Sequence, residues 1–324
     1  MSDLKRAPAA VTGPPGATLA AGGLPRRRGL LVLISVAFAL FLSYAWSSKL
    51  VDTEIGVNTA NALLGHDAHT TPIAGIAAGV LFAFVSGLAG SFTACNIAVF
   101  GAVGPMVGQS GTRREKLLHT ARPLGWLAAG MIPVSAAYGA LVGFAGTRMP
   151  QFSTASAPAG TISARSAQSM IAFGLIGLAM IVLGLAAAGV VPDPLGPLSR
   201  RRPNARMVVL GVLVGGFLIG RPYPLFRDLF RHAAATHNPL YGAAAFVLQS
   251  VGNILVMSVL VIALTYGLGG RLQRWLSASP GRVAAVTAVA FLVAGVFTLV
   301  YWDVRILGRL GYIWFPTAPW NAAH

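Results

Sequence analysis

The sequence predicts an all-α polytopic membrane protein, with one N-terminal anchor helix and a six-helix core of two inverted three-helix repeats. Three observations lead to this prediction. The 324-residue chain is 55% hydrophobic and only 10% charged, whereas an ordinary soluble domain has about 25% charged residues. Long apolar runs recur along the chain, with basic residues gathered at alternate ends of these runs. Six of the runs also fall into two similar sets of three.

Seven apolar runs are long enough to cross a bilayer, which requires about 20 residues of helix. They are 29–48, 73–107, 123–147, 169–191, 207–226, 240–268 and 282–302. The run 73–107 is too long for one straight helix and contains several glycines and Pro105, so we interpret it as a span followed by a bend or a broken helix. The run 207–226 ends in Arg221-Pro222-Tyr223-Pro224, which predicts a second break because proline ends or kinks helices.

The other segments follow from these spans. Residues 1–28 are rich in Ala, Pro and Gly and end in three arginines, which is typical of a disordered basic cytoplasmic tail. We interpret 29–48 as a retained anchor rather than a cleaved signal peptide, because its apolar run exceeds the usual signal length. The remaining organisation is an external loop 49–72, a first repeat 73–191, a basic cytoplasmic loop 192–206, a second repeat 207–302 and an external aromatic tail 303–324. Trp302, Trp314 and Trp320 are expected at the membrane interface.

The net charge of +16, from 24 Lys and Arg against 8 Asp and Glu, has two possible explanations. Basic residues can collect nucleic-acid phosphates on one face, or they can mark the cytoplasmic loops of a membrane protein. Sixteen of the 24 lie in residues 1–28 and in the alternate loops 108–122, 192–206 and 269–282. This alternation argues against nucleic acid as a partner. It predicts a multi-pass protein of the plasma membrane, with the lipid bilayer as its surroundings, a cytoplasmic N-terminus and an external C-terminus.

The two sets of three spans begin in the same way. Each opens with a glycine-rich span that ends in a helix-breaking polar motif, GLAGSFTACNIAVFGAVGPM at 87–106 and GGFLIGRPYPLFRDLF at 215–230. Because each set has an odd number of spans, the second lies upside down relative to the first. Many transporters place a mid-membrane site between such inverted repeats with broken helices. Broken backbone is tolerated only where it is buried in protein or lines a polar cavity, so we expect the two breaks to meet at one site.

The first motif carries the only cysteine, in Ser91-Phe92-Thr93-Ala94-Cys95. With Asn238–Gly242 and Val251–Asn253 in the second half, this arrangement resembles the transmembrane region of cytochrome c biogenesis proteins, shared with DsbD-type thiol:disulfide interchange proteins. The resemblance implies a redox-active thiol at Cys95 and a thioredoxin-like or haem-handling partner. The chain departs from the family because no cysteine lies near 221–224 and Ala94 replaces a proline. Thiol–disulfide exchange needs a second sulfur, so the resemblance implies an altered mechanism.

Polar residues inside or beside the apolar runs are candidates for a binding site or gate. Arg221, Arg227 and Asp228 could bind an anion or carboxylate near the external mouth, or the arginines could bind lipid headgroups while Asp228 neutralises one of them. The amides Asn96, Gln249 and Asn253 could line a cavity, or form interhelical hydrogen bonds. Pro105, Pro222 and Pro224 complete this set because they break the helices.

Metal and cofactor signals are weak. His66 and His69 have a spacing that can supply two metal ligands, but we favour solvated loop histidines, since no further ligand is identifiable. No C-x-x-C-H haem attachment pattern and no nucleotide-binding glycine loop occurs, so we expect no cofactor.

Three functions are consistent with these observations. The first is a cytochrome c biogenesis or thiol–disulfide type of membrane protein with an altered mechanism. The second is a small-solute or metal-ion transporter on the same inverted-repeat scaffold. The third is a membrane subunit without catalytic activity, which docks a partner through its aromatic tail.

Overall fold

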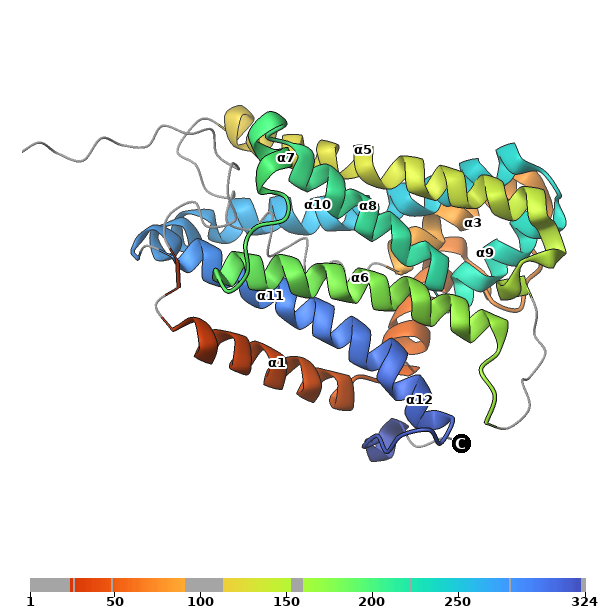
Figure 1. The fold of residues 1–324 in the computed structure, drawn as a ribbon. Coiled ribbons are helices and arrows are strands. Elements are labelled where there is room, and N and C mark those ends of the chain that lie inside the picture. The colour runs from red at the N-terminus through yellow and green to blue at the C-terminus, as the bar shows by residue number, and fades with distance from the viewer. Residues whose placement is uncertain are drawn as a thin grey trace, which may run out of the picture.

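The computed structural model of this chain describes residues 24–25, 27–47, 49–90, 113–152, 160–221, 223–279 and 281–321. These residues form helices and turns, with no strand among them (Figure 1). The α-helices are α1 (Arg28–Ala45), α2 (Asn58–Leu64), α3 (Gly75–Ala89), α5 (Arg113–Ala145), α6 (Ala164–Ala188), α7 (Gly196–Arg201), α8 (Ala205–Gly220), α9 (Pro224–Ala235), α10 (Pro239–Ser277), α11 (Arg282–Leu299) and α12 (Arg305–Arg309). The π-helical segments are η1 (Lys49–Val57) and η5 (Val300–Val304), and the 3-10 turns are η3 (Gly146–Arg148), η4 (Pro150–Phe152) and η6 (Pro319–Asn321).

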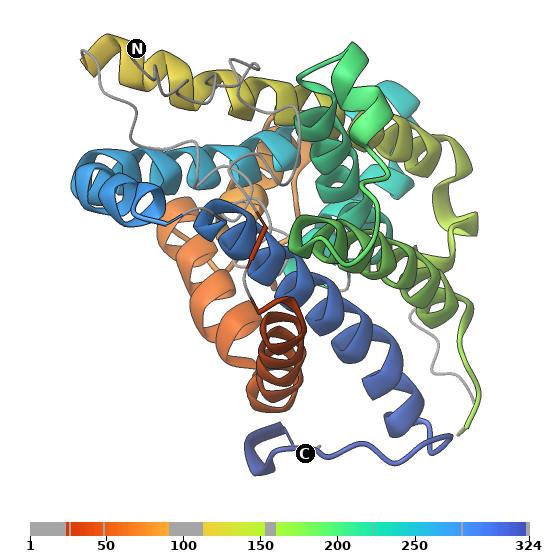
Figure 2. The ribbon, with the colours of Figure 1, turned by 60° about the vertical axis from the view of Figure 1, so that its left-hand side comes forward.

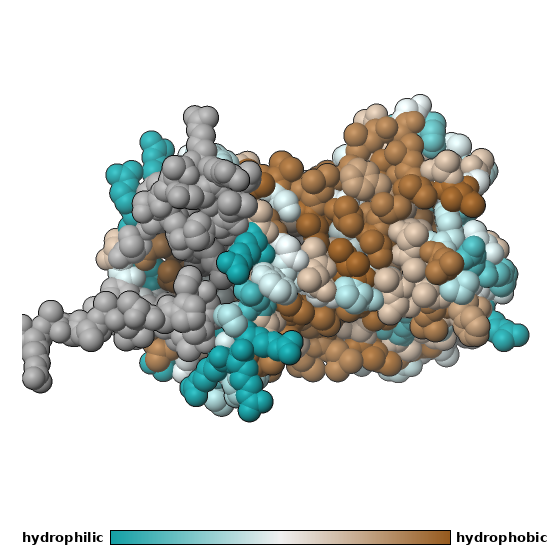
Figure 3. All heavy atoms as spheres, turned by 90° about the horizontal axis from the view of Figure 1, so that it is seen from above, coloured by the Kyte–Doolittle hydropathy of each residue, from teal (hydrophilic) through white to brown (hydrophobic). Residues whose placement is uncertain are grey.

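Among the described residues, five helical stretches are long and apolar enough to cross a membrane. They are Arg28–Ala45, Ala121–Arg148, Ala164–Ala188, Pro239–Ala263 and Arg282–Arg309. The pair α8 and α9 makes a sixth if it is counted as one span, and α3 is a shorter apolar helix. Figure 3 shows hydrophobic side chains across the middle of one face of the molecule, with hydrophilic side chains toward its ends. The predicted class, an all-α polytopic membrane protein, is confirmed.

The long helices run back and forth along one axis (Figure 1). Helices α1, α5, α8 and α11 begin at one end of the molecule, and α6 and α10 begin at the opposite end. We call the first the basic-loop end, because Arg27 and Arg28 lie there, with Arg200 and Arg201 on α7. The opposite end, where residues 310–321 lie, is the tail end. Helix α1 packs against α11 beside the bundle of the other spans (Figures 1 and 2).

Two equivalent crossings join the halves, each between the first helix of one half and the second helix of the other. Helix α8 crosses α5 where Gly130 faces the carbonyl oxygen of Val208 and Gly211 faces that of Leu127. Helix α3 crosses α10 where Gly87 faces the carbonyl oxygen of Gln249 and Gly252 faces that of Phe84. At each crossing a glycine faces the carbonyl three residues before the partner glycine.

The third helices of the two halves pair with each other across equivalent glycines. Gly177 faces the carbonyl oxygen of Gly295, and Gly295 faces that of Gly177. Each of these glycines lies thirteen residues after the first residue of its helix, Ala164 in α6 and Arg282 in α11. This reciprocity is what two inverted three-helix repeats predict. Small residues let spanning helices approach closely, which is the main source of attraction between helices in lipid.

The break after α8 comes from two X-Pro steps in succession. A residue before proline is pushed out of the helical region, and Arg221 and Tyr223 are accordingly extended, with ψ of 116° and 130°. Pro224 then opens α9 as its first residue, where its missing N–H costs nothing. The axis turns by 80° between the two helices.

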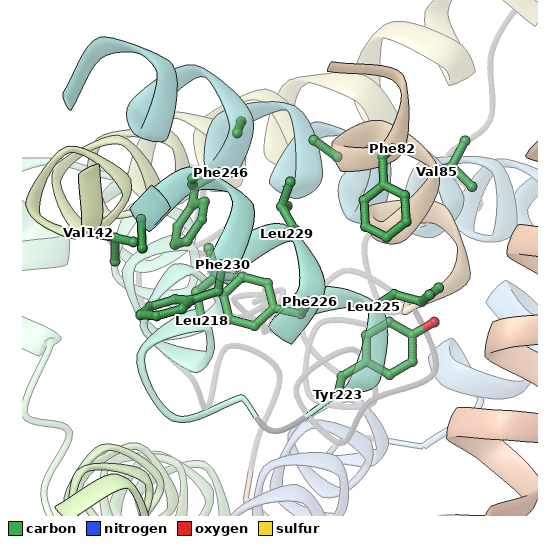
Figure 4. Packing of buried hydrophobic residues seen from close by; sticks show 14 of the residues in the cluster. Phe82, Val85, Val142, Leu218, Tyr223, Leu225, Phe226, Leu229, Phe230 and Phe246 are labelled. Carbon is green, nitrogen blue, oxygen red and sulfur yellow. The ribbon is translucent and has the colours of Figure 1, made fainter. Parts of the chain in front are cut away.

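Helix α9 closes the tail end of the core. It buries Leu225, Phe226, Leu229, Phe230 and Ala233 along one face. Figure 4 shows the two phenylalanines of this face directed toward Phe246 of α10, and their ring centroids lie 5.2 and 6.3 Å from that ring. This packing fixes the direction in which the chain leaves the break.

The helices differ from the predicted segments in two places. The segment 49–72 was expected to be a loop, but it contains η1 and α2, and the last span continues through η5 and α12 to Arg309 rather than ending at 302. Hydropathy locates the apolar part of a span only. Backbone hydrogen bonds extend a helix beyond it wherever polar side chains have partners or reach solvent.

Replacing Gly130 by alanine should destabilise the protein, because the added Cβ would overlap the carbonyl oxygen of Val208 in α8. Overpacking of this kind costs about 1–3 kcal/mol, so we expect the apparent melting temperature in detergent to fall by several degrees. Gly125 on the same helix has open space around it. Gly125→Ala is the matched control and should leave the melting temperature unchanged or slightly higher. Equal melting temperatures for the two variants would contradict the close crossing.

Candidate functional site

The C-terminal ends of the two short spans, α3 and α8, meet at one point. The Arg221 guanidinium, through Nη2, donates a hydrogen bond to the carbonyl oxygen of Gly90 at the end of α3. A Cβ on residue 90 would overlap this guanidinium, so the glycine permits the contact. The last carbonyls of a helix lack intrahelical partners and carry partial negative charge. Arg221 therefore satisfies the end of α3 while extending the chain from the end of α8.

The final carbonyls of α8 are satisfied by side chains from the first repeat. Gln168 Nε2 donates to the carbonyl oxygen of Ile219 at 2.8 Å, and Ser169 Oγ donates to that of Gly220 at 2.8 Å. Gln151 donates a further hydrogen bond to the Ile219 oxygen. These bonds allow α8 to end inside the protein without unpaired backbone groups.

A cavity of about 70 Å³ lies beside the meeting point, among residues of the spanning helices. Its polar wall consists of Asp52, Arg221, Gln249, Ser250 and Asn253. Its aromatic wall consists of Trp46, Phe173, Phe217, Tyr223, Phe297, Tyr301 and Trp302. We call this the deep cavity. A single water needs about 10–15 Å³ on such a scale, so the deep cavity has room for several waters or a small ligand.

Gln249 is the most unusual group in the deep cavity. Its side chain is fully buried, at 0% exposure, and neither Oε1 nor Nε2 has a hydrogen-bond partner among the described residues. The adjacent Ser250 is satisfied, because its hydroxyl lies 2.6 Å from the Ser135 hydroxyl. A buried amide without partners costs about 1–3 kcal/mol, so a cavity that keeps one is suited to a polar ligand.

A larger cavity of about 550 Å³ lies on the tail side of the deep cavity. Six basic side chains line it: Lys49, Arg165, Arg221, Arg227, Arg305 and Arg309. Asp52 is the one carboxylate among the described residues that line it. We call this the basic vestibule. A concave surface lined by one sign of charge raises the local concentration of oppositely charged solutes.

Arg305 lines the basic vestibule and has buried donors without partners in the described structure. Its side chain is only 3% exposed, and its Nε and Nη1 have no hydrogen-bond partner among the described residues. Its guanidinium lies over the Tyr301 ring at 4.6 Å from the centroid, an arrangement that favours the cation. The Nε of Arg227 is also buried without a partner in the described structure.

Four residues line both cavities and form the neck between them: Asp52, Arg221, Tyr301 and Trp302. Asp52 comes from the π-helical η1, whereas Tyr301 and Trp302 come from the π-helical η5. Single π-turns are frequent at functional sites because they redirect side chains from the regular helical faces. Gly56 of η1 packs against the Tyr223 ring, where a Cβ would come within 2.7 Å of the hydroxyl.

The structure places the predicted site residues in different parts of the molecule. Arg221, Gln249 and Asn253, expected from separate arguments, line the deep cavity together, whereas Arg227 and Pro224 line the basic vestibule. Cys95, Asn96, Pro105 and Pro222 lie outside the described residues.

His69 and Asp228 form a pair that the sequence did not predict. His69 Nδ1 lies 2.6 Å from Asp228 Oδ2, which links the loop before α3 to α9. The loop is shaped by Asp67, whose carboxylate accepts backbone hydrogen bonds from His69 and Thr70, and these bonds lower the pKa of Asp67. His66 is exposed. Within the described residues no three His, Cys, Asp or Glu side chains gather closely enough to hold a metal ion.

Sequence reasoning missed the neck. Asp52 was assigned to a loop, and Trp302 was expected at the membrane interface rather than in a cavity wall. One signal for the vestibule was available: Lys49, Arg165, Arg305 and Arg309 belong to the minority of basic residues on the side where the positive-inside rule predicts few.

The chain was compared with protein-family models, with curated proteins and with solved structures, and none of the three comparisons finds a match. The function of this chain is therefore inferred from the geometry of the two cavities.

Asp52 should make stability depend on pH. Burial raises the pKa of this carboxyl, and the nearby Arg221 charge offsets only part of that rise. A raised pKa means that the folded state binds the proton more tightly than the unfolded state. The contribution to stability is therefore full below the unfolded pKa and is lost as pH rises through the folded pKa. We expect Asp52→Asn to melt a few degrees higher than wild type at pH 8, with the difference disappearing at pH 4.

The matched control is Glu54→Gln, which removes an exposed carboxylate from the same η1 segment. Thermal unfolding in detergent across pH 4–8 measures both variants. A pH-independent difference between Asp52→Asn and wild type would contradict the buried carboxyl.

Proposed function

We propose that this protein transports small anionic solutes across the membrane, receiving them in the basic vestibule and passing them to the deep cavity. The observation that carries the proposal is the vestibule itself, with six basic side chains against one carboxylate and buried guanidinium nitrogens that have no hydrogen-bond partner in the described structure. Charge at this depth is costly and usually marks a pathway or a paired site. An anion would supply the missing acceptors.

The scaffold supports the same proposal. Inverted repeats with short, broken spans are typical of secondary transporters, in which the site lies at the repeat interface. Here Arg221 and Gly90 join the ends of α3 and α8, the equivalent short helices of the two halves. By the positive-inside rule the basic-loop end is cytoplasmic, so the vestibule at the tail end would open to the outside.

Uptake of ¹⁴C-acetate, ¹⁴C-benzoate and ³²P-phosphate into proteoliposomes tests this proposal. We expect Arg305→Gln to lower the initial uptake rate at low substrate about tenfold or more, because a hydrogen bond to a charged group contributes about 1.5–3 kcal/mol. Arg200→Gln removes an exposed arginine at the basic-loop end and should not affect uptake. Failure of all three anions to enter faster than into protein-free liposomes would overturn the proposal, as would equal rates for wild type and Arg305→Gln.

Cys95→Ser separates this proposal from the thiol–disulfide function that the family resemblance implies. Anion uptake needs no thiol, so the variant should retain the wild-type uptake rate within about twofold, whereas Arg221→Ala should lose uptake through loss of the neck cation. A redox function predicts the opposite for Cys95, with complete loss of function in Cys95→Ser and a mixed disulfide to a partner that can be trapped in membranes.

A further inference from the structure

The basic vestibule has the charge distribution of a site for multivalent anions. Its six cations cover the whole range of exposure to solvent. Lys49 and Arg309 are exposed, Arg165 and Arg227 are half-buried, and Arg221 and Arg305 are buried. We infer that the anions bound in the vestibule are small organic acids with two or three carboxylates, in preference to monocarboxylates. The inference rests on the proposed function and names the substrate class for the same site.

Positive charges from different helices come close together in this cavity. Arg305 and Arg309 lie four residues apart on α12, so they share one face of that helix. On the other helices, Arg227 of α9 lies near enough to Arg165 of α6 for their charges to repel each other. The attraction of an anion to such a group of cations grows in proportion to the charge of the anion. The vestibule therefore favours anions with more than one negative charge.

The protein itself compensates little of this charge. Asp52 is the one carboxylate against six basic side chains among the described residues that line the vestibule. Salt screens charges that are buried or partly buried much less than it screens exposed ones, so the excess of positive charge persists inside the cavity. A ligand with two or three carboxylates brings the vestibule closer to neutrality than a monocarboxylate does.

The vestibule also has an apolar part that suits the carbon body of an organic acid. Tyr301, Trp302, Ile306 and Leu310 line it together with the arginines. A hydrocarbon chain that joins two carboxylates gains free energy when it packs on such side chains. An interior cavity of about 150 Å³ is large enough to bind benzene. The vestibule, at about 550 Å³, therefore has room for a small organic acid together with waters.

Competition against ¹⁴C-succinate, measured at equilibrium and pH 8 on the full-length protein in phosphatidylcholine nanodiscs, tests the inference. Succinate and succinamate have nearly the same size, but the amide of succinamate removes one negative charge. We expect succinate to bind about tenfold tighter than succinamate, in line with one interaction between charged groups. Tricarballylate, with three carboxylates, should compete at least as well as succinate. Sulfate, a dianion without a hydrocarbon body, should compete about threefold worse or more.

Variants with opposite expected effects locate the site. Arg309→Gln removes an exposed cation of the vestibule and should weaken succinate about three- to tenfold, with a smaller effect on succinamate. The matched control, Arg148→Gln, removes an exposed arginine at the same end that lines neither cavity, and it should change neither affinity. Asp52→Asn removes the carboxylate that competes with the ligand, so succinate should bind about threefold tighter. A misfolded variant cannot produce this gain.

The outcomes are distinguishable from those of the proposed function. Equal affinities for succinate and succinamate, equal competition by sulfate and succinate, or equal effects of Arg309→Gln and Arg148→Gln would overturn the substrate class. Stronger competition by dihexanoyl phosphatidylglycerol, a soluble anionic lipid, than by tricarballylate would also overturn it and would assign the arginines to a lipid headgroup. Each of these results leaves anion transport in place if acetate, benzoate or phosphate is taken up. Failure of succinate to bind, with no uptake of these three anions, would overturn both.

Discussion

The structure depends on the burial of one positive charge, that of Arg221, between the ends of two helices. A buried cation is tolerated only when surrounding groups replace its hydration, and here the Gly90 carbonyl at the negative end of α3 and the Tyr223 ring at 5.1 Å do so. The same side chain is held by an X-Pro step that prevents α8 from continuing. Because the charge needs both helix ends in place, it links the end of α3 to the end of α8, beside which the cavities lie.

The glycine crossings place the other groups of the site around this charge. Gly87 packs on the backbone carbonyl of Gln249, so the crossing of α3 and α10 leaves no room for a side chain between the two backbones. The Gln249 side chain lies buried beside the crossing, in the wall of the deep cavity. Close backbone contact in a membrane protein usually contributes stability. In this fold it also sets the position of an unpaired amide relative to Arg221.

Hydropathy and proline placement were sufficient to predict the fold class, the second break and three residues of the deep cavity. They could not predict the neck, because Asp52 and Trp302 belong to π-helical segments next to spans, where apolar periodicity carries no information about side-chain direction. The pairing of His69 with Asp228 was equally inaccessible, since it joins segments 159 residues apart. The helical continuation to Arg309 was missed because its basic side chains line a cavity and give no apolar signal.

The charge distribution has two separate physical causes. Basic residues in short loops bias orientation during insertion, and by this rule their number on the basic-loop side would place that side in the cytoplasm. The arginines at 165, 227, 305 and 309 instead lie on helices and line a cavity. They run against the positive-inside bias, so membrane orientation does not explain their positions. These like charges repel one another, which costs free energy. The positive charges of Arg165 and Arg231, for example, disfavour the charge of Arg227. An anion that enters the vestibule relieves this repulsion, and Asp52 at the neck is the one carboxylate among the described lining residues that can take its place when it leaves.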